Sequence, residues 1–114
     1  MIASLYRLRG DKSFKDVLDR GILVQAESFG IAFVKREDED VPRFGFIVST
    51  KVSKEAVQRN RIKRALSEAV RFMTGDIKKG YDVVFLAKQK AAKTSTDMLM
   101  NEVRGAIQNA GLLK

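Results

Sequence analysis

Hydrophobic residues recur at helical spacing in three segments of this chain. The first segment, Asp11–Arg20, can be capped by Asp11 or Ser13 and ended by Gly21. The last segment begins at residues 94–97, which resemble a capping box, and ends at Gly111. The residues expected to share a helix face are Phe14, Val17 and Leu18 in the first segment and Leu99, Val103, Ala106, Ile107 and Ala110 in the last.

The middle helical segment is the longest and has both an apolar and a basic side. Ser53 can cap it, Glu55 in its first turn suits the helix dipole, and Thr74-Gly75 can end it. Its apolar arc consists of Ile62, Ala65, Leu66, Ala69, Val70 and Met73. Opposite this arc lie Asn60, Arg64, Ser67 and Arg71, while Arg59, Lys63 and Arg61 flank its edges. We therefore expect one side to pack on a sheet and the other to present hydrogen-bond donors.

Four segments have the composition of β-strands. Residues 22–26 and Phe29–Lys35 are rich in strand formers, and a polar turn over residues 37–42 precedes a third strand at residues 43–49. Tyr81–Ala87 is a nearly continuous apolar run. The predicted order is αβββαβα, with the first three strands in an antiparallel meander, and the fold class is α+β.

The second and third predicted strands alternate between large and small side chains. One face carries the bulky residues Phe29, Ile31, Phe33, Phe44, Phe46 and Val48, and the other carries Gly30, Ala32, Val34, Gly45, Ile47 and Ser49. Because burial of large apolar area is favourable, we expect the bulky residues to form the core. The opposite face is then either a shallow groove for an extended chain or a surface on which a helix packs closely.

Composition limits the class of protein. A length of 114 residues fits a single domain, residues 1–114, and the absence of Cys excludes disulfides and thiolate metal sites. No apolar run approaches the ~18 residues of a membrane span, so a soluble, cytoplasmic protein is expected.

Positive charge is concentrated in one quarter of the chain. The net charge is +8, and residues 43–72 contain eight basic residues against two acidic ones. Such a block favours a polyanionic partner, RNA or DNA, because binding releases condensed counterions. A membrane surface is also anionic, but the basic helix has no Trp and its apolar residues are needed for the core, which disfavours membrane binding.

The string KVSKEAVQRNRIKR, from Lys51 to Arg64, resembles the signature of the ribonuclease P protein family, centred on Arg59-Asn60-Arg61. The similarity continues in Leu8-Arg9 and the first helix, in the strand RFGFIVS, and in Tyr81-Asp82 with the apolar run that follows. It extends from about Arg7 to Ala110. The signature is far more specific than a basic patch.

This resemblance implies a fold and a function. The fold is a two-layer α+β sandwich, similar to a domain of a small-subunit ribosomal protein, with an uncommon left-handed βαβ crossover from the third strand through the long helix to the last strand. The function is that of an accessory subunit, one per catalytic RNA. That RNA hydrolyses precursor tRNA with the help of Mg²⁺, bound mainly by the RNA and the substrate, and releases the mature 5' end.

The resemblance also implies two sets of site residues, with no catalytic residue and no metal ligand in the protein. Contacts to the catalytic RNA are implied for Arg59, Asn60, Arg61, Lys63 and Arg64. Contacts to the single-stranded 5' leader, in a cleft between the first helix and the open sheet face, are implied for Phe14, Leu18, Ala32, Ile47, Ser49 and Lys51. Arg59 and Arg61 are expected to be exposed.

Two other functions remain as alternatives. A protein nuclease needs a general base, a nucleophile or metal ligands, yet the chain has no His or Cys and its dense carboxylates, residues 37–40, lie in a predicted turn. A general RNA-binding module explains the basic helix equally well. It does not explain the agreement of the flanking segments with the ribonuclease P pattern.

Overall fold

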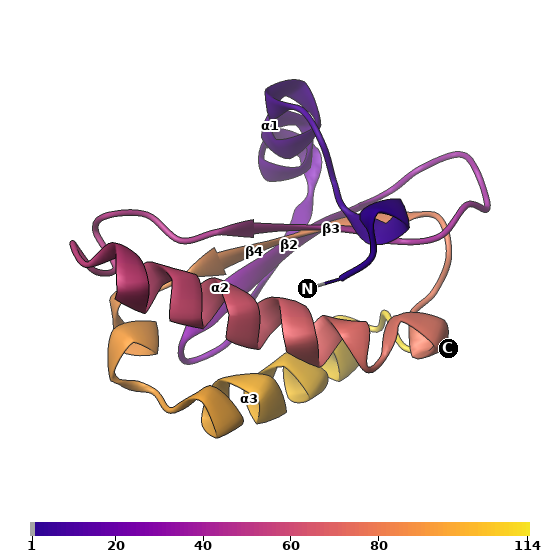
Figure 1. The fold of residues 1–114 in the computed structure, drawn as a ribbon. Coiled ribbons are helices and arrows are strands. Elements are labelled where there is room, and N and C mark those ends of the chain that lie inside the picture. Colours follow the sequence, from indigo (N-terminus) through magenta and orange to yellow (C-terminus); the bar gives the residue numbers. More distant parts are fainter. Residues whose placement is uncertain (1) are drawn as a thin grey trace.

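The computed structural model describes residues 2–114 and contains one mixed sheet with three α-helices (Figure 1). The elements in chain order are α1 (Asp11–Arg20), β1 (Ile22–Gln25), β2 (Phe29–Lys35), β3 (Arg43–Ile47), α2 (Ala56–Arg71), β4 (Tyr81–Ala87) and α3 (Thr96–Asn109). Short 3-10 helices lie at Ser4–Tyr6, Thr74–Asp76 and Gln89–Lys93. The predicted α+β class and the order αβββαβα are confirmed. Within the described residues, no helix has the length and apolar character needed to cross a membrane.

The antiparallel meander predicted for the first three strands is wrong at its third strand. The sheet order is β1-β2-β4-β3, so β4 lies between β2 and β3. It pairs antiparallel with β2 and parallel with β3, which makes β3, α2 and β4 a crossover unit between neighbouring parallel strands. This central position is compatible with the composition of β4, because Val83, Val84 and Phe85 are fully buried.

The residues that precede the three α-helices differ from the predicted caps. Gly10, with a φ of 87°, precedes α1 in place of a capping Asp11 or Ser13. The Oγ of Ser53 accepts a hydrogen bond from the Glu55 N–H at 3.2 Å, but α2 begins later, at Ala56. For α3 the cap lies within the predicted segment 94–97 but is Ser95 rather than Thr94, the first residue of the predicted box, since the Oγ of Ser95 accepts from the Met98 N–H at 3.2 Å.

The two faces of the sheet are covered unequally. In Figure 1, α2 and α3 lie on one face and α1 on the other. The bulky face forms the main core, as predicted: Phe29, Ile31, Phe33 and Phe44 are buried there, and Phe46 and Val48 pack against them. The Phe85 ring lies 5.5 Å from the Phe29 ring and 5.3 Å from the Phe46 ring. The opposite face has a smaller core of Leu8, Val17, Ala32 and Val84.

Candidate nucleic-acid interface

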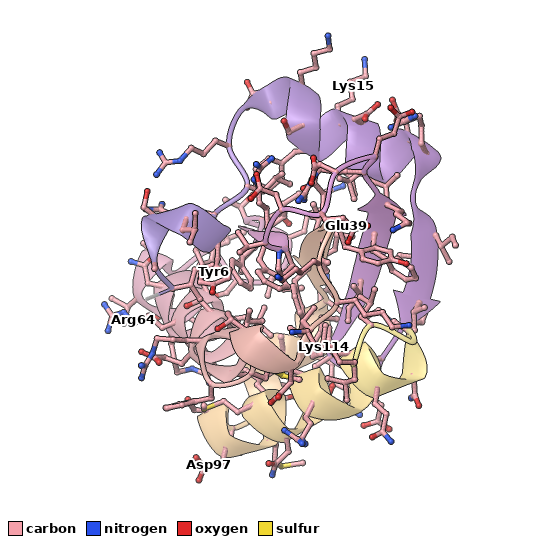
Figure 2. The ribbon with its side chains drawn as sticks, turned by 90° about the vertical axis from the view of Figure 1, so that its right-hand side faces the viewer. Tyr6, Lys15, Glu39, Arg64, Asp97 and Lys114 are labelled. Carbon is pink, nitrogen blue, oxygen red and sulfur yellow. The ribbon has the colours of Figure 1, made fainter. Side chains whose placement is uncertain are left out.

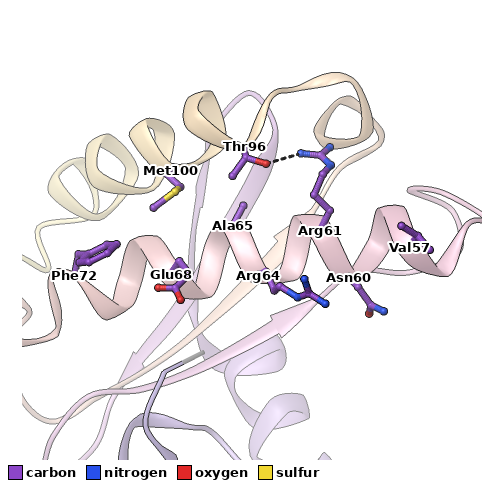
Figure 3. Close-up of a pocket in the computed structure, with 9 residues that line it drawn as sticks. All are labelled: Val57, Asn60, Arg61, Arg64, Ala65, Glu68, Phe72, Thr96 and Met100. Carbon is purple, nitrogen blue, oxygen red and sulfur yellow. Dashed lines mark hydrogen bonds between the residues drawn. The ribbon is translucent and has the colours of Figure 1, made fainter.

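The basic motif lies in the first half of α2, and its side chains divide into two groups. Asn60, Lys63 and Arg64 are exposed, whereas Arg59 and Arg61 are half-buried. Figure 3 shows Arg61 pointing toward the start of α3 and both Asn60 and Arg64 pointing away from α3. The expectation that Arg59 and Arg61 are both exposed is therefore wrong. Both lie at the edges of the apolar arc of α2, where neighbouring segments cover them.

Arg61 joins α2 to the segment that leads into α3. Its Nε donates a hydrogen bond to Gln58 Oε1 at 2.7 Å, Nη1 donates to Thr96 Oγ1 at 3.2 Å, and Nη2 donates to the carbonyl of Ala91 at 3.3 Å. The side chain of Gln58 donates to the neighbouring Ala92 carbonyl at 2.9 Å. Arg61 therefore positions the helix, and part of its donor capacity is already used.

Arg59 is held at the start of the same helix. Its Nη1 donates to the carbonyl of Ser53 at 2.9 Å, which ties α2 to the loop that precedes it. A guanidinium has five N–H donors, and this is the one hydrogen bond of the Arg59 side chain within residues 2–114. Arg59 thus keeps most of its donors for another ligand.

Ser67, predicted on the exposed side of α2, is buried. It lines a small hollow of about 110 Å³ together with Ile2, Arg7 and Lys63. The segment before α1 therefore covers this side of α2. Its position is fixed at β3, where the Leu8 N–H donates to the Phe44 carbonyl at 2.9 Å.

A groove of about 560 Å³ runs between α2 and α3 beside the basic motif (Figure 3). Asn60, Arg61 and Arg64 line it together with apolar side chains, and Phe72 is 69% exposed at one end. Arg71 lies over the Phe72 ring at 4.5 Å, and its Nε donates to Glu68 at 2.6 Å, which lowers the pKa of the Glu68 carboxyl. The sequence alone did not predict this groove. Its signal was the placement of Val57 and Phe72 outside the apolar arc.

On the other face of the sheet, α1 and β3 enclose a hollow of about 440 Å³. Three of the predicted leader-binding residues line it, namely Phe14, Leu18 and Ile47. Asp11, Lys15 and Asp19 complete the lining. These three side chains were not among the predicted leader contacts, although helical spacing places Asp11 and Lys15 on the same face of α1 as the predicted contact Leu18.

The predicted small-residue face serves both of the purposes that the sequence left open. A Cβ on Gly45 would lie 2.4 Å from Cε2 of Phe14, so glycine lets α1 pack closely on β3. Ala32 is 4% exposed in the same small core as Val17 and Val84, so its side chain is not available as a leader contact. Beyond α1 the face remains open as the 440 Å³ hollow.

The remaining predicted leader contacts, Ser49 and Lys51, are exposed in the loop between β3 and α2. Lys51 lines a separate hollow of about 510 Å³ with Lys90 and Lys93. Lys90 Nζ is 2.8 Å from Glu27, and this hydrogen-bonded ion pair lowers the pKa of Glu27 and raises that of Lys90. Of the three lysines, Lys51 and Lys93 have no carboxylate within 4.0 Å among residues 2–114.

The acidic turn between β2 and β3 is bound to arginines. Asp38 accepts hydrogen bonds from the Nε of Arg36 at 3.1 and 3.2 Å, and Asp40 lies 3.7 Å from Arg43. Within the described part of the chain, no three Asp, Glu, His or Cys side chains gather in a group that could hold a metal ion.

Comparison with known proteins identifies the same family as the motif. Residues 2–111 match the protein family described as Ribonuclease P. The ribonuclease P protein component of Exiguobacterium sibiricum is 32% identical over 109 residues, covering 96% of this chain and 93% of that protein. The component from Clostridium kluyveri is 35% identical over 116 residues, covering 96% and 98%.

Solved structures show the same fold. The RNase P protein of Staphylococcus aureus superimposes with a TM-score of 0.89 at 27% identity, covering 96% of this chain and 98% of that chain. The RNase P protein from Thermotoga maritima superimposes with a TM-score of 0.80 at 26% identity, covering 90% and 96%. The motif, the fold and the near-complete coverage agree, and the chain belongs to the ribonuclease P protein family.

Proposed function

We propose that this chain acts as the accessory protein of ribonuclease P, one copy per catalytic RNA, in the cytoplasm. In this role it binds the catalytic RNA and the 5' leader of precursor tRNA, while the RNA carries out the hydrolysis that releases the mature 5' end. The observation that carries the proposal is the exposure of Asn60, Lys63 and Arg64 on α2, inside the segment that resembles the family signature.

The exposed side of α2 suits the surface of a folded RNA. Arg64 and Lys63 supply donors and positive charge for phosphate oxygens, and the amide of Asn60 can bond sugar hydroxyls or base edges. Arg59 keeps four of its five donors and joins this surface. Arg61 contributes mainly by holding α2 against the start of α3.

The hollow between α1 and β3 suits the bases of a single strand more than its phosphates. Phe14, Leu18 and Ile47 offer apolar contact that tolerates any base sequence. Asp11 and Asp19 at the rim outnumber Lys15 and repel a phosphate. We therefore propose that the leader phosphates bind at the separate 510 Å³ hollow, where Lys51 and Lys93 supply the positive charge.

In this proposal magnesium remains with the RNA. Mg²⁺ prefers oxygen ligands in near-octahedral geometry and is commonly bound through phosphates and water. Asn60 offers it one amide oxygen, and the Asp38 carboxylate is hydrogen-bonded to Arg36. No step of the reaction is assigned to a protein-bound metal.

The test is cleavage of a precursor tRNA with a 5' leader by the cognate catalytic RNA at low magnesium. Three reactions are compared, containing the RNA alone, the RNA with this chain, and the chain alone. We expect stimulation that requires the RNA. Cleavage by the chain alone would favour the protein nuclease instead.

Variants of exposed residues test whether the stimulation depends on the exposed side of α2. Asn60→Ala with Arg64→Ala should reduce stimulation, whereas Lys12→Ala on the exposed side of α1 is the control and should not. RNA binding without stimulation, and without preference for the catalytic RNA over a random RNA, would favour a general RNA-binding module.

A further inference from the structure

A second group of basic residues lies away from the α2 motif, at the end of the sheet where β2 ends and β4 begins. Lys35, Lys78, Lys79 and Lys114 surround a hollow of about 410 Å³ together with Glu39 and Tyr81. Figure 2 shows Glu39 and Lys114 on this side of the molecule. We call Lys35, Lys78, Lys79 and Lys114 the lysine patch. Lys35, the adjacent pair Lys78-Lys79 and Lys114 lie far apart in sequence, so the charge pattern along the chain does not show that they form one group.

The ammonium groups of the lysine patch have no close acidic partner. Within residues 2–114, none of the four has a carboxylate within 4.0 Å, whereas Arg20, Arg36, Arg71 and Lys90 each have at least one. Glu39 is the single acidic residue in the lining. Four cations around one hollow repel one another and raise the local potential, which a polyanion relieves by neutralising them.

Backbone hydrogen bonds fix the chain on which three of these lysines stand. The Lys78 N–H donates to the Leu112 carbonyl at 2.8 Å, and the Lys114 N–H donates to the Asp76 carbonyl at 2.8 Å. Ile77 and Leu113 form an antiparallel bridge between the same two segments. Lys78, Lys79 and Lys114 therefore project from paired segments rather than from free loops.

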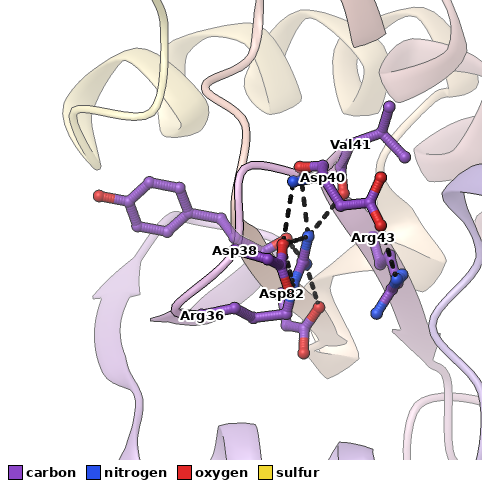
Figure 4. Close-up of polar contacts among 7 residues, drawn as sticks. Arg36, Asp38, Asp40, Val41, Arg43 and Asp82 are labelled. Carbon is purple, nitrogen blue, oxygen red and sulfur yellow. Dashed lines mark hydrogen bonds and ion pairs between the residues drawn. The ribbon is translucent and has the colours of Figure 1, made fainter.

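Gly80 and Arg36 hold the same end of the sheet through hydrogen bonds, and Figure 4 shows Arg36 among Asp38, Asp40, Val41 and Asp82. The Gly80 N–H donates to the Asp40 carbonyl at 2.7 Å, and its carbonyl accepts from the Arg36 N–H at 2.7 Å. Gly80 has a φ of +81°, and a Cβ there would lie 2.6 Å from the Asp38 carbonyl oxygen. The Arg36 guanidinium is 2.6 Å from Asp82 and donates to the Val41 carbonyl at 2.8 Å. A rigid turn thus holds Lys79 beside Lys35 and Glu39.

The surroundings of the patch distinguish between anionic partners. A membrane-binding surface needs exposed apolar side chains that enter the lipid. The large hydrophobic residues that are exposed, Leu5, Leu18, Ile22, Leu23, Val57, Phe72 and Met98, are all absent from this lining. Phosphate groups on a rigid backbone need only fixed cations, which this surface provides.

We propose that the lysine patch is a second RNA-binding surface, separate from α2 and from the α1 hollow, that binds the phosphodiester backbone of an RNA helix or strand. This inference rests on the proposed function, since it places a further part of the same RNA assembly on the protein. Two RNAs of the proposed assembly have a phosphodiester backbone that this surface can bind, namely the catalytic RNA and the precursor tRNA.

The experiment uses Lys78→Gln with Lys79→Gln. Its control is Lys12→Gln with Arg104→Gln, which removes the same charge from exposed positions on α1 and α3. In one arm, the Kd of the protein for the catalytic RNA is measured against salt concentration. In the other, the Kd of the assembled complex for precursor tRNA is measured in the same way. Thermal unfolding by circular dichroism checks that all variants fold alike.

Two lost phosphate contacts should lower the slope of log K against log salt by about 1.4 to 1.8, because each contributes about 0.7 for a single strand and about 0.9 for a duplex. A lower slope in the first arm identifies the catalytic RNA, and one in the second arm alone identifies precursor tRNA. Slopes equal to wild type in both arms, or an equal fall in the control, would overturn the proposal. Because binding is measured separately from cleavage, a wild-type chain that binds without stimulating would count against the proposed function instead.

Discussion

The two faces of the sheet differ in how much they bury and in what they leave available. The face under α2 and α3 holds Phe29, Phe44 and Phe85, each at most 1% exposed. The face under α1 has a small core around Val17 and Val84 and leaves the rest as a hollow. Because buried apolar area supplies most of the folding free energy, stability is concentrated on the first face. The second face can then remain shallow and bind a partner without loss of the fold.

The largest expected difference between the two faces is in unfolding free energy, and two neighbouring residues on β4 test it. Phe85 points into the main core, and we expect Phe85→Ala to lower the free energy of unfolding by about 3–5 kcal/mol. Leu86 faces the opposite side and is half-buried, so Leu86→Ala should cost about 1 kcal/mol. Urea unfolding followed by circular dichroism measures both. Equal losses would mean that the two faces contribute alike.

Gly45→Ala tests how tightly α1 is seated on the shallow face. The added Cβ would meet the Phe14 ring, so the ring must move, and overpacking of this kind costs about 1–3 kcal/mol. Displacement of Phe14 should also weaken leader binding, measured as a smaller gain in affinity from the leader than in the wild type when tRNAs with and without the leader are compared. Adding Phe14→Leu should restore most of the stability but not the leader affinity. If the double variant recovered neither stability nor leader affinity, the strain would not come from contact between residue 45 and the Phe14 ring.

Arg61→Ala and Arg64→Ala separate support of the main core from RNA contact. Arg61 makes two hydrogen bonds that join α2 to the α3 side and a third to Gln58 within α2, and its loss should cost about 1–2 kcal/mol of stability. Arg64 is exposed, so its loss should change stability by less than about 0.5 kcal/mol. Arg64→Ala should instead lower the salt slope for the catalytic RNA by about 0.9. If Arg64→Ala lowered stability and Arg61→Ala lowered the salt slope, the roles assigned to the two arginines would be wrong.

Local patterns predicted the elements but not the contacts between distant ones. The alternation in β2 and β3 identified the core face correctly, and the apolar run of β4 indicated a buried strand. The insertion of β4 between β2 and β3 depends on how α2 returns the chain, which hydrophobic spacing does not encode.

The candidate site shows the same limit. Helical spacing placed Asn60 and Arg64 on the exposed side of α2, as the structure has them. It did not show that Arg61 reaches the Ala91 carbonyl and Thr96, because those contacts cross at least thirty positions of sequence. Likewise, Lys35 and Lys114 meet at one hollow only after folding.

The smallest effect is expected at the turn between β2 and β3, which lies outside both cores. The Arg36 guanidinium, through its hydrogen bonds, lowers the pKa of the Asp38 carboxyl in the folded protein. A carboxyl with a lowered folded-state pKa contributes stability above its unfolded pKa of about 4 and loses it as the pH falls through the folded value. The contribution is small because Asp38 is half-exposed to solvent and the pair is screened.

Asp38→Asn should therefore lower the urea midpoint slightly at neutral pH and flatten its decline as the pH falls below about 4. The control is Glu37→Gln, since Glu37 has no ion pair among residues 2–114 and its loss should leave the decline unchanged. An unaltered decline in Asp38→Asn would mean that Asp82 and the carbonyl groups of Tyr81 and Val41 hold Arg36 without help from Asp38. The turn would then be fixed from the sheet side, and the lysine patch beside it would keep its geometry in acid.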